Sequence, residues 1–246
     1  MSKGRSRSHM IIKIILGVVV ILVLVIVAFL AKMLYEQSKM HPADTQEILS
    51  DIFTIRNSHV NFYLIKSGEK YIAIDAGLSS DTTTDELQKL GISSDNIIAV
   101  LLTHTDSDHI GALSLFSNAT VYIGSDEIQM IDGTVSRNFF TKNKLDVPYE
   151  TLSNGETLEL FNMKIECIFT PGHTNGSVCY LINGKYLFVG DTLSLQDNEV
   201  GLFSSFYNMN NEMQKNSIKR LSELNDIQYI FSGHYGFSDK AVFVSD

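Results

Sequence analysis

The sequence predicts an α/β domain, with sheets inside and helices outside, preceded by one apolar N-terminal helix. A long apolar stretch follows a short basic leader. Short runs rich in Val, Ile, Leu, Phe and Tyr then recur from residue 51 onward, separated by turn residues. Amphipathic stretches with helical spacing lie between several of these runs. Strand pairs mixed with helices are typical of layered α/β domains, and one domain is sufficient here.

Residues 10–31 are expected to form a transmembrane anchor. Residues 14–31 carry no charge, and Lys13 alone interrupts residues 11–31. A helix over residues 11–31 rises roughly 31 Å, about the hydrocarbon thickness of a bilayer. Residues 1–9 form a basic leader without acids, so the N-terminus is expected to stay in the cytoplasm. We therefore expect a single-pass protein of the cell membrane, with its folded domain outside the cytoplasm.

The alternative for this segment is a cleaved signal peptide, which would allow secretion of the domain. The apolar region of a signal peptide spans about 7 to 15 residues and ends at a site of small residues. Here the run is longer, and Phe29 stands two positions before Ala31. The sequence favours an uncleaved anchor. A juxtamembrane segment over residues 32–50, a stalk or a first helix, would then lead into the folded domain over residues 51–246.

The charge balance of the folded part restricts its partners. Residues 32–246 hold 15 basic and 28 acidic residues, a net charge of −13. Such a surface repels polyphosphate chains, so nucleic acid is not expected as a partner. A small molecule is the expected partner of the domain, and the membrane that of the N-terminal helix.

The expected elements alternate along the chain. Strands are expected over residues 51–57, 59–68, 70–77, 96–104, 119–124, 157–170, 176–184, 185–191 and 227–234. Helices are expected over residues 82–92, 108–116 and 210–224, the first with a threonine cap, and a further helix is expected to begin at residue 125. Residues 133–155 are expected to be irregular. The cysteines Cys167 and Cys179 flank a loop between two strands, so either a disulfide or two buried thiols is expected.

The stretch LLTHTDSDHIGAL, residues 101–113, holds two of the seven histidines close to two aspartates. Imidazoles and carboxylates so close together repel or desolvate one another unless a cation lies between them. Residues two apart in an extended chain face the same side, so His104 and Asp106 can share one ion. The chain then turns, and Asp108 and His109 can reach a second ion.

Three further candidate ligands stand at strand ends beside turn residues. TPGHTNGS contains His173, LFVGDTLS contains Asp191 and IFSGHYG contains His234. Each residue alone would be an ordinary capping or turn residue. Together with the first motif, they indicate a centre with two metal ions, because side chains from separate strand ends can converge.

The order of these residues, with Asp75 before them, resembles the metallo-β-lactamase-fold hydrolase superfamily from about residue 50 to the end. The resemblance implies an αββα sandwich of two mixed sheets. It implies that one ion is bound by His104, Asp106 and His173, that the other is bound by Asp108, His109 and His234, and that Asp191 bridges them. Asp75 resembles the aspartate that orients metal-site groups in this family without binding a metal.

One position departs from the family, which usually has histidine where this sequence has Asp106. Carboxylates also bind zinc, so two zinc ions remain the expected cofactors. The added negative charge should raise the pKa of bound water and widen tolerance for iron or manganese. We expect a more basic pH–rate profile than that of an Asp106→His variant.

The resemblance implies a hydrolase in which a metal-bridging hydroxide, oriented by Asp108, cleaves an ester, thioester, lactone, amide or phosphoester. Tyr235, Thr192 and His59 are candidate substrate contacts. A β-lactam is not favoured, because the cysteine-ligand β-lactamases have cysteine where this chain has Asp191. Two alternatives stay open. One is a diiron redox protein, although such proteins rely on a flavin-binding partner domain for which this sequence has no residues. The other is a noncatalytic binding module.

Overall fold

The structure is a computed structural model that describes residues 3–137, 142–239 and 242–243, in two compact units, residues 1–40 and 41–246. The first unit holds helix α1 (Lys3–Gln37), longer at both ends than the expected anchor. Within it, His9–Gln37 is long and apolar enough to cross a membrane, judged by length and composition. Its large apolar side chains are exposed on every face, unlike those of an amphipathic helix that packs on a core.

The first sheet of the second unit has seven strands in the order in which they follow along the chain. They are β1 (Gln46–Leu49), β2 (Ile52–Asn57), β3 (Val60–Ser67), β4 (Lys70–Ile74), β5 (Ile97–Leu102), β6 (Thr120–Gly124) and β7 (Tyr149–Leu152). The first four form an antiparallel meander, and β4 to β7 run parallel. Five of the six side chains of β5 are buried, in keeping with its continuous apolar sequence.

The second sheet has six strands in the order β15-β14-β11-β10-β9-β8. They are β8 (Thr157–Leu160), β9 (Met163–Phe169), β10 (Val178–Ile182), β11 (Tyr186–Gly190), β14 (Tyr229–Ser232) and β15 (Gly236–Ser238). Only the pairing of β11 with β14 is parallel, so this sheet is mixed as well. A small third sheet joins β12 (Ser194–Gln196), β13 (Glu199–Gly201) and β16 (Val242–Phe243).

Short helices complete the unit. The α-helices are α2 (Ser80–Lys89), α3 (Ser107–Ile110), α4 (Ile128–Asp132) and α5 (Asn211–Ser222), and the 3₁₀ turns are η1 (Ser94–Asn96), η2 (Leu113–Leu115) and η3 (Ser125–Glu127). Leu87 of α2 packs on the outer face of the first sheet against Phe62 and Val100. Leu221 of α5 is buried, and Ser217 of α5 donates to the backbone after β9, on the outer side of the second sheet.

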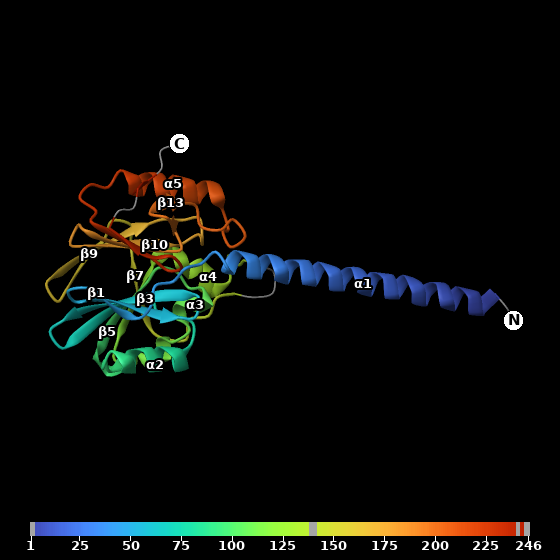
Figure 1. Ribbon diagram of the computed structural model, residues 1–246, viewed down its shortest axis with the longest axis horizontal. Coiled ribbons are helices and arrows are strands. Elements are labelled where there is room, and N and C mark those ends of the chain that lie inside the picture. The colour runs from blue at the N-terminus through green and yellow to red at the C-terminus, as the bar shows by residue number, and fades with distance from the viewer. Residues whose placement is uncertain (1–2, 138–141, 240–241, 244–246) are drawn as a thin grey trace. The chain divides into compact units, whose positions relative to one another are not determined.

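The main core lies between the two large sheets, where Tyr63 and Ile72 of the first pack with Tyr180 and Phe188 of the second. Figure 1 shows α2 and α5 at opposite outer sides of the paired sheets. The layer order is therefore helix, sheet, sheet, helix, which confirms the αββα sandwich expected from the sequence.

Several local expectations are wrong. Residues 46–49 form β1 and pair with β2, although they lie in the stretch expected to be a stalk or first helix. β7 lies in the stretch expected to be irregular. Residues 157–170 form a hairpin rather than one strand, because Phe161 and Asn162 take left-handed φ values of 52° and 66°. Helix α2 is capped by Ser79 rather than by a threonine. The helix expected over 108–116 ends at Ile110 and continues as a 3₁₀ turn.

The two cysteines lie on neighbouring strands but face opposite sides of the sheet. Cys167 of β9 lies opposite Tyr180, whereas Cys179 of β10 lies opposite Ile168. Both are buried free thiols, so the disulfide alternative is wrong. Burial raises the pKa of the Cys167 thiol to about 12 and that of the Cys179 thiol to about 11.

Candidate metal centre

The seven side chains predicted to bind metal come together at the edge of the sandwich where β5, β11 and β14 end. His104 and Asp106 follow β5, and Asp108 and His109 lie in α3. Asp191 follows β11 and His234 follows β14. His173 lies in the loop between β9 and β10. β11 and β14 are parallel neighbours and share one C-terminal edge, and the packing of the two sheets brings the end of β5 against the end of β11.

Gly233 makes this convergence possible. A Cβ at this position would lie 2.7 Å from Asp191 Oδ1 and 2.8 Å from His109 Cε1. Any side chain at position 233 would therefore push the end of β14 away from Asp191 after β11 and from His109 in α3.

At one end of the site, His104, Asp106 and His173 lie with their ligand atoms within 4.8 Å of one another; we call this group the Asp106 end. Asp106 Oδ2 is 3.6 Å from His104 Nε2 and 3.1 Å from His173 Nε2. Zinc binds imidazole nitrogen at 2.0–2.1 Å, so two ligand atoms of one tetrahedral ion lie ~3.4 Å apart. The spacing at the Asp106 end fits that requirement.

At the opposite end, His59, Asp108 and His234 form a second group of the same composition; we call it the Asp108 end. Asp108 Oδ2 is 3.4 Å from His234 Nε2 and 3.5 Å from His59 Nε2. The grouping differs from the one that the family resemblance implies, because it contains His59 and leaves out His109. His109 groups instead with His104 and Asp191.

Asp191 lies between the two ends. Its Oδ2 is 3.3 Å from His173 Nε2 and 3.2 Å from His234 Nε2, and its Oδ1 is 3.3 Å from His109 Nε2. One carboxylate therefore faces histidines of both groups, the position expected of a bridging ligand.

Three buried atoms of the site make no well-aligned hydrogen bond with the described residues: His104 Nε2, His109 Nε2 and Asp191 Oδ1, although the last two lie 3.3 Å apart as an ion pair. Buried polar atoms without partners cost about 1–3 kcal/mol each, so folded proteins normally satisfy them. All three are atoms that zinc prefers as ligands. The residues present therefore fit a divalent metal centre, and the metal would satisfy these atoms.

Asp75 orients one of the candidate ligands, as the family resemblance implies. Asp75 Oδ2 lies 2.8 Å from His109 Nδ1, and the same carboxylate accepts hydrogen bonds from Thr103 N and Thr103 Oγ1. These contacts leave His109 Nε2 to face Asp191. Fixing one imidazole nitrogen in this way is how outer partners orient metal-binding histidines.

Glu127 is a supporting residue that the sequence did not reveal. Its side chain is buried and accepts hydrogen bonds from Thr105 N, Thr105 Oγ1 and Thr174 Oγ1. Burial raises the pKa of this carboxyl, and the hydrogen bonds oppose the shift. Glu127 thus ties the loop of His104 and Asp106 to the loop of His173. Glu127 follows Asp126 at the start of a predicted helix, where acids are common, so no local signal distinguished it.

Arg137 and Asn143 were also missed, since both lie in the stretch expected to be irregular. The Arg137 guanidinium pairs with both oxygens of Asp106, with Nε at 3.2 Å from Oδ1, and Nη2 lies 2.8 Å from His173 Nε2. Asn143 Nδ2 donates to Asp106 Oδ1 at 3.0 Å. The carboxylate that departs from the family pattern is therefore held by a cation and an amide.

One histidine at each end, His173 or His234, has a strongly shifted pKa, and the two shifts have opposite signs. Burial lowers the pKa of His173 to about 4, helped by Arg137 and opposed by Asp191. Burial also lowers the pKa of His234, but the carboxylates of Asp191 and Asp108 outweigh it and raise that pKa to about 10. Near neutral pH, His173 is ready to bind a metal, whereas His234 must first lose a proton.

The three candidate substrate contacts lie in different surroundings. Thr192 is buried, and its hydroxyl contacts Thr170 Oγ1 and Cys179 Sγ, which leaves it no surface for a substrate. Tyr235 is buried against Phe203. His59 is 28% exposed and belongs to the Asp108 end.

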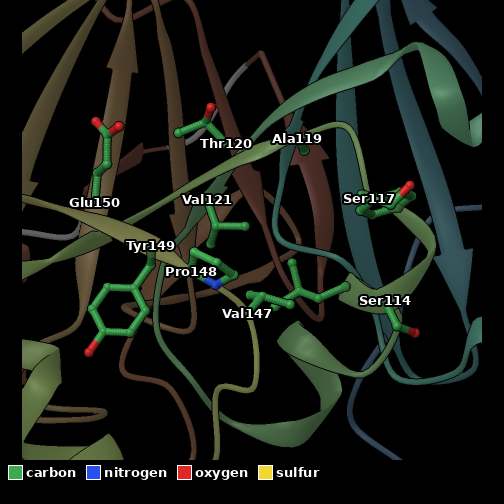
Figure 2. Close-up of a pocket in the computed structure, with 11 residues that line it drawn as sticks. Ser114, Ser117, Ala119, Thr120, Val121, Val147, Pro148, Tyr149 and Glu150 are labelled. Carbon is green, nitrogen blue, oxygen red and sulfur yellow. The ribbon is translucent and has the colours of Figure 1, made fainter.

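A surface pocket lies elsewhere, at the start of β6 and β7 (Figure 2). It is lined mainly by apolar and hydroxyl side chains, among them Val121, Val147 and Pro148. The strands β5, β6 and β7 are parallel, so their starts lie at the edge opposite to the candidate ligands. None of the candidate ligands lines this pocket, and the chemistry is therefore assigned to the histidine–aspartate cluster.

Residues 55–234 match the model of the metallo-beta-lactamase superfamily. Curated relatives include a probable polyketide biosynthesis zinc-dependent hydrolase of Bacillus velezensis, 32% identical over 131 residues, which are 52% of each chain. A hydroxyacylglutathione hydrolase of Buchnera aphidicola is 32% identical over 150 residues, 59% of this chain and 51% of the relative. The chain thus spans about half the length of these relatives.

Solved structures agree on the fold. A subclass B3 metallo-beta-lactamase of Bradyrhizobium japonicum superposes with a TM-score of 0.63 at 18% identity, covering 79% of both chains. A subclass B3 enzyme isolated from a soil metagenome library gives a TM-score of 0.61 at 21% identity, covering 78% of this chain and 80% of the other. The resemblance inferred from the motifs is confirmed: the chain belongs to the metallo-β-lactamase superfamily.

Proposed function

We propose that the protein is a membrane-tethered hydrolase that holds two divalent ions, zinc in the first place, and cleaves an ester, thioester, lactone, amide or phosphoester. The observation that carries the proposal is the set of buried ligand atoms on His104, His109 and Asp191 that make no well-aligned hydrogen bond. Such atoms are costly in a structural core and are useful in a metal centre. The zinc-dependent hydrolase among the relatives supports the choice of metal and of reaction.

Bound divalent ions would supply Lewis-acid charge and lower the pKa of a water molecule toward neutrality. The chain's own residues would determine where the substrate enters. Asp106, Asp108, Arg137 and His59 keep 16%, 21%, 25% and 28% of their side chains exposed, whereas Asp191 keeps only 4%. The substrate would therefore approach from the side of the exposed residues, with Asp108 placed to orient the attacking water.

Phe203 forms an apolar wall between the two ends. Its ring lies 5.0 Å from that of His173 and 5.4 Å from that of His234, and the residue is buried. It belongs to an apolar and aromatic segment that precedes α5.

The length and composition of His9–Gln37 support the membrane tether. We place the leader in the cytoplasm and the domain outside it, following the basic residues before the apolar stretch. Protease digestion of intact and opened cells tests this arrangement: the domain should be cleaved in intact cells.

Elemental analysis of the full chain in detergent, combined with a panel of nitrophenyl esters, thioesters, lactones and phosphodiesters, tests the activity. We expect about two zinc ions per chain and turnover that a chelator abolishes and zinc restores. Metal-free protein without turnover after reconstitution would contradict the proposal. Two irons with visible absorbance would instead favour the diiron redox alternative, which the carboxylate of Asp106 suggests.

A further inference from the structure

The turn between β2 and β3 carries a histidine into the candidate metal centre. Ser58 and His59 form this turn, and Ser58 adopts a left-handed φ of 65°. The ring of His59 stacks on that of His234, with centroids 5.6 Å apart and an interplanar angle of 9°. His59 Nε2 points to Asp108 Oδ2 at 3.5 Å.

The turn is held firmly against the end of β14. The backbone N–H of Asn61 donates to Gly233 O at 2.6 Å, and the Tyr63 hydroxyl donates to Ser232 O at 2.8 Å. His59 O lies 2.7 Å from His234 Nδ1, so the same turn also orients a candidate ligand. The placement of His59 is therefore built into the packing of the two sheets.

The ring nitrogens of His59 have separate surroundings. Nδ1 lies 3.4 Å from Ser58 Oγ, whereas Nε2 faces Asp108. A metal-binding imidazole normally presents one nitrogen to the ion and the other to an outer partner. His59 meets both conditions.

We propose that His59 is a ligand of the ion held by Asp108 and His234. This assignment rests on the proposed metal centre and adds a residue to the ligand set that the family resemblance implies. Two ligand atoms on one tetrahedral zinc lie ~3.4 Å apart, and Asp108 Oδ2 is 3.5 Å and 3.4 Å from the two imidazoles. Each end of the site then offers one aspartate and two histidines, with Asp191 between them and His109 beside Asp191.

Cobalt binding to His59→Cys in the full chain tests the assignment directly. A thiolate bound to cobalt gives a near-ultraviolet charge-transfer absorption, and we expect that band in His59→Cys. Ser117→Cys, exposed at the opposite edge of the sheet, is the matched control and should give no band. The native cysteines should stay silent, because burial raises the pKa of both thiols to about 11 or higher.

Zinc affinities of the wild type and of His59→Ala provide the second measurement, with thermal unfolding as the check on folding. We expect one of two ions to bind at least about tenfold more weakly in His59→Ala, while the other is unchanged. If His59→Ala does not fold, the charge-transfer band alone decides.

The outcomes separate the two proposals. A wild type that binds two ions, with no cobalt band in His59→Cys, would overturn the assignment of His59 and leave the proposed function standing. The assignment would be overturned even if His59→Ala weakened zinc binding, because His59 would then act through Asp108. A wild type that binds no transition metal would overturn both proposals.

Discussion

The two ends of the candidate metal centre have the same composition but opposite electrostatic surroundings. At the Asp106 end, the carboxylate pairs with Arg137, and the pKa of His173 falls to about 4. At the Asp108 end, the carboxylate contacts imidazoles, and the pKa of His234 rises to about 10. Two sites with the same ligand types can therefore differ in metal affinity. Nearby charges shift the pKa of each histidine, and a metal must displace any proton that the histidine holds.

The difference also bears on the substitution of aspartate for the family's usual histidine. Sequence alone suggests that Asp106 makes the centre less positive. The structure places the Arg137 guanidinium on that carboxylate, which returns a positive charge to the same end. Arg137 thus offsets much of the negative charge that the aspartate adds to the centre.

The largest expected effect comes from removing the residue that the two ends share. Asp191→Asn keeps the size of the side chain but removes the charge that faces His173, His109 and His234. We expect hydrolysis to fall about 10³-fold, since several kcal/mol of metal-dependent stabilisation would be lost. Metal content should fall below two ions per chain. Unchanged turnover would show that the ends work independently of Asp191.

The pH dependence of zinc binding should separate the ends. His234 is protonated below about pH 10 and must release a proton to bind zinc, so affinity at the Asp108 end should rise about tenfold per unit between pH 6 and 8. His173 is already neutral above pH 5, so affinity at the Asp106 end should change little. Calorimetry in buffers of different ionisation enthalpy would measure proton release for each ion. Equal release for both ions would contradict the comparison.

A smaller effect is expected from Arg137→Met, which keeps an apolar stem and removes the cation. Arg137 Nη2 contacts Asp106 Oδ2 and His173 Nε2, the same atoms that zinc would use. Two unit charges 4 Å apart interact by about 4 kcal/mol at an effective dielectric constant of 20, and part of this should appear as about tenfold tighter zinc binding at the Asp106 end. Arg137→Lys keeps the charge and serves as the control. Weaker binding in Arg137→Met would instead show that Arg137 acts mainly by orienting Asp106.

The smallest expected effect is on the pH–rate profile of Asp106→His. A neutral imidazole in place of the carboxylate removes a negative charge, so the kinetic pKa of the wild type should be higher than that of the variant. Because Arg137 already compensates Asp106, we expect a difference below about one pH unit. Repeating the measurement in the Arg137→Met background should enlarge the difference. If the kinetic pKa values with Asp106 and with histidine were equal in both backgrounds, the charge at this position would not control the pH–rate profile.

Much of the fold was predictable because its signals are local. The apolar run of β5, the alternation in β2 and the Asn183-Gly184 turn each depend on neighbouring residues only. β1 and β7 were missed because each is a short edge strand whose exposed side chains carry little pattern. The hairpin of β8 and β9 was missed because its turn, Phe161-Asn162, lacks glycine.

The sequence by itself indicated seven candidate ligands, His104, Asp191 and His234 among them, because these histidines and aspartates stand at strand ends beside turn residues. Only the tertiary structure decided the partners of each ligand. Arg137 reaches Asp106 across 31 positions, and His59 reaches His234 across 175. No local pattern encodes such contacts, since they arise from the packing of the two sheets and their loops. That packing sets the charge around each imidazole, and thereby the difference between the two ends.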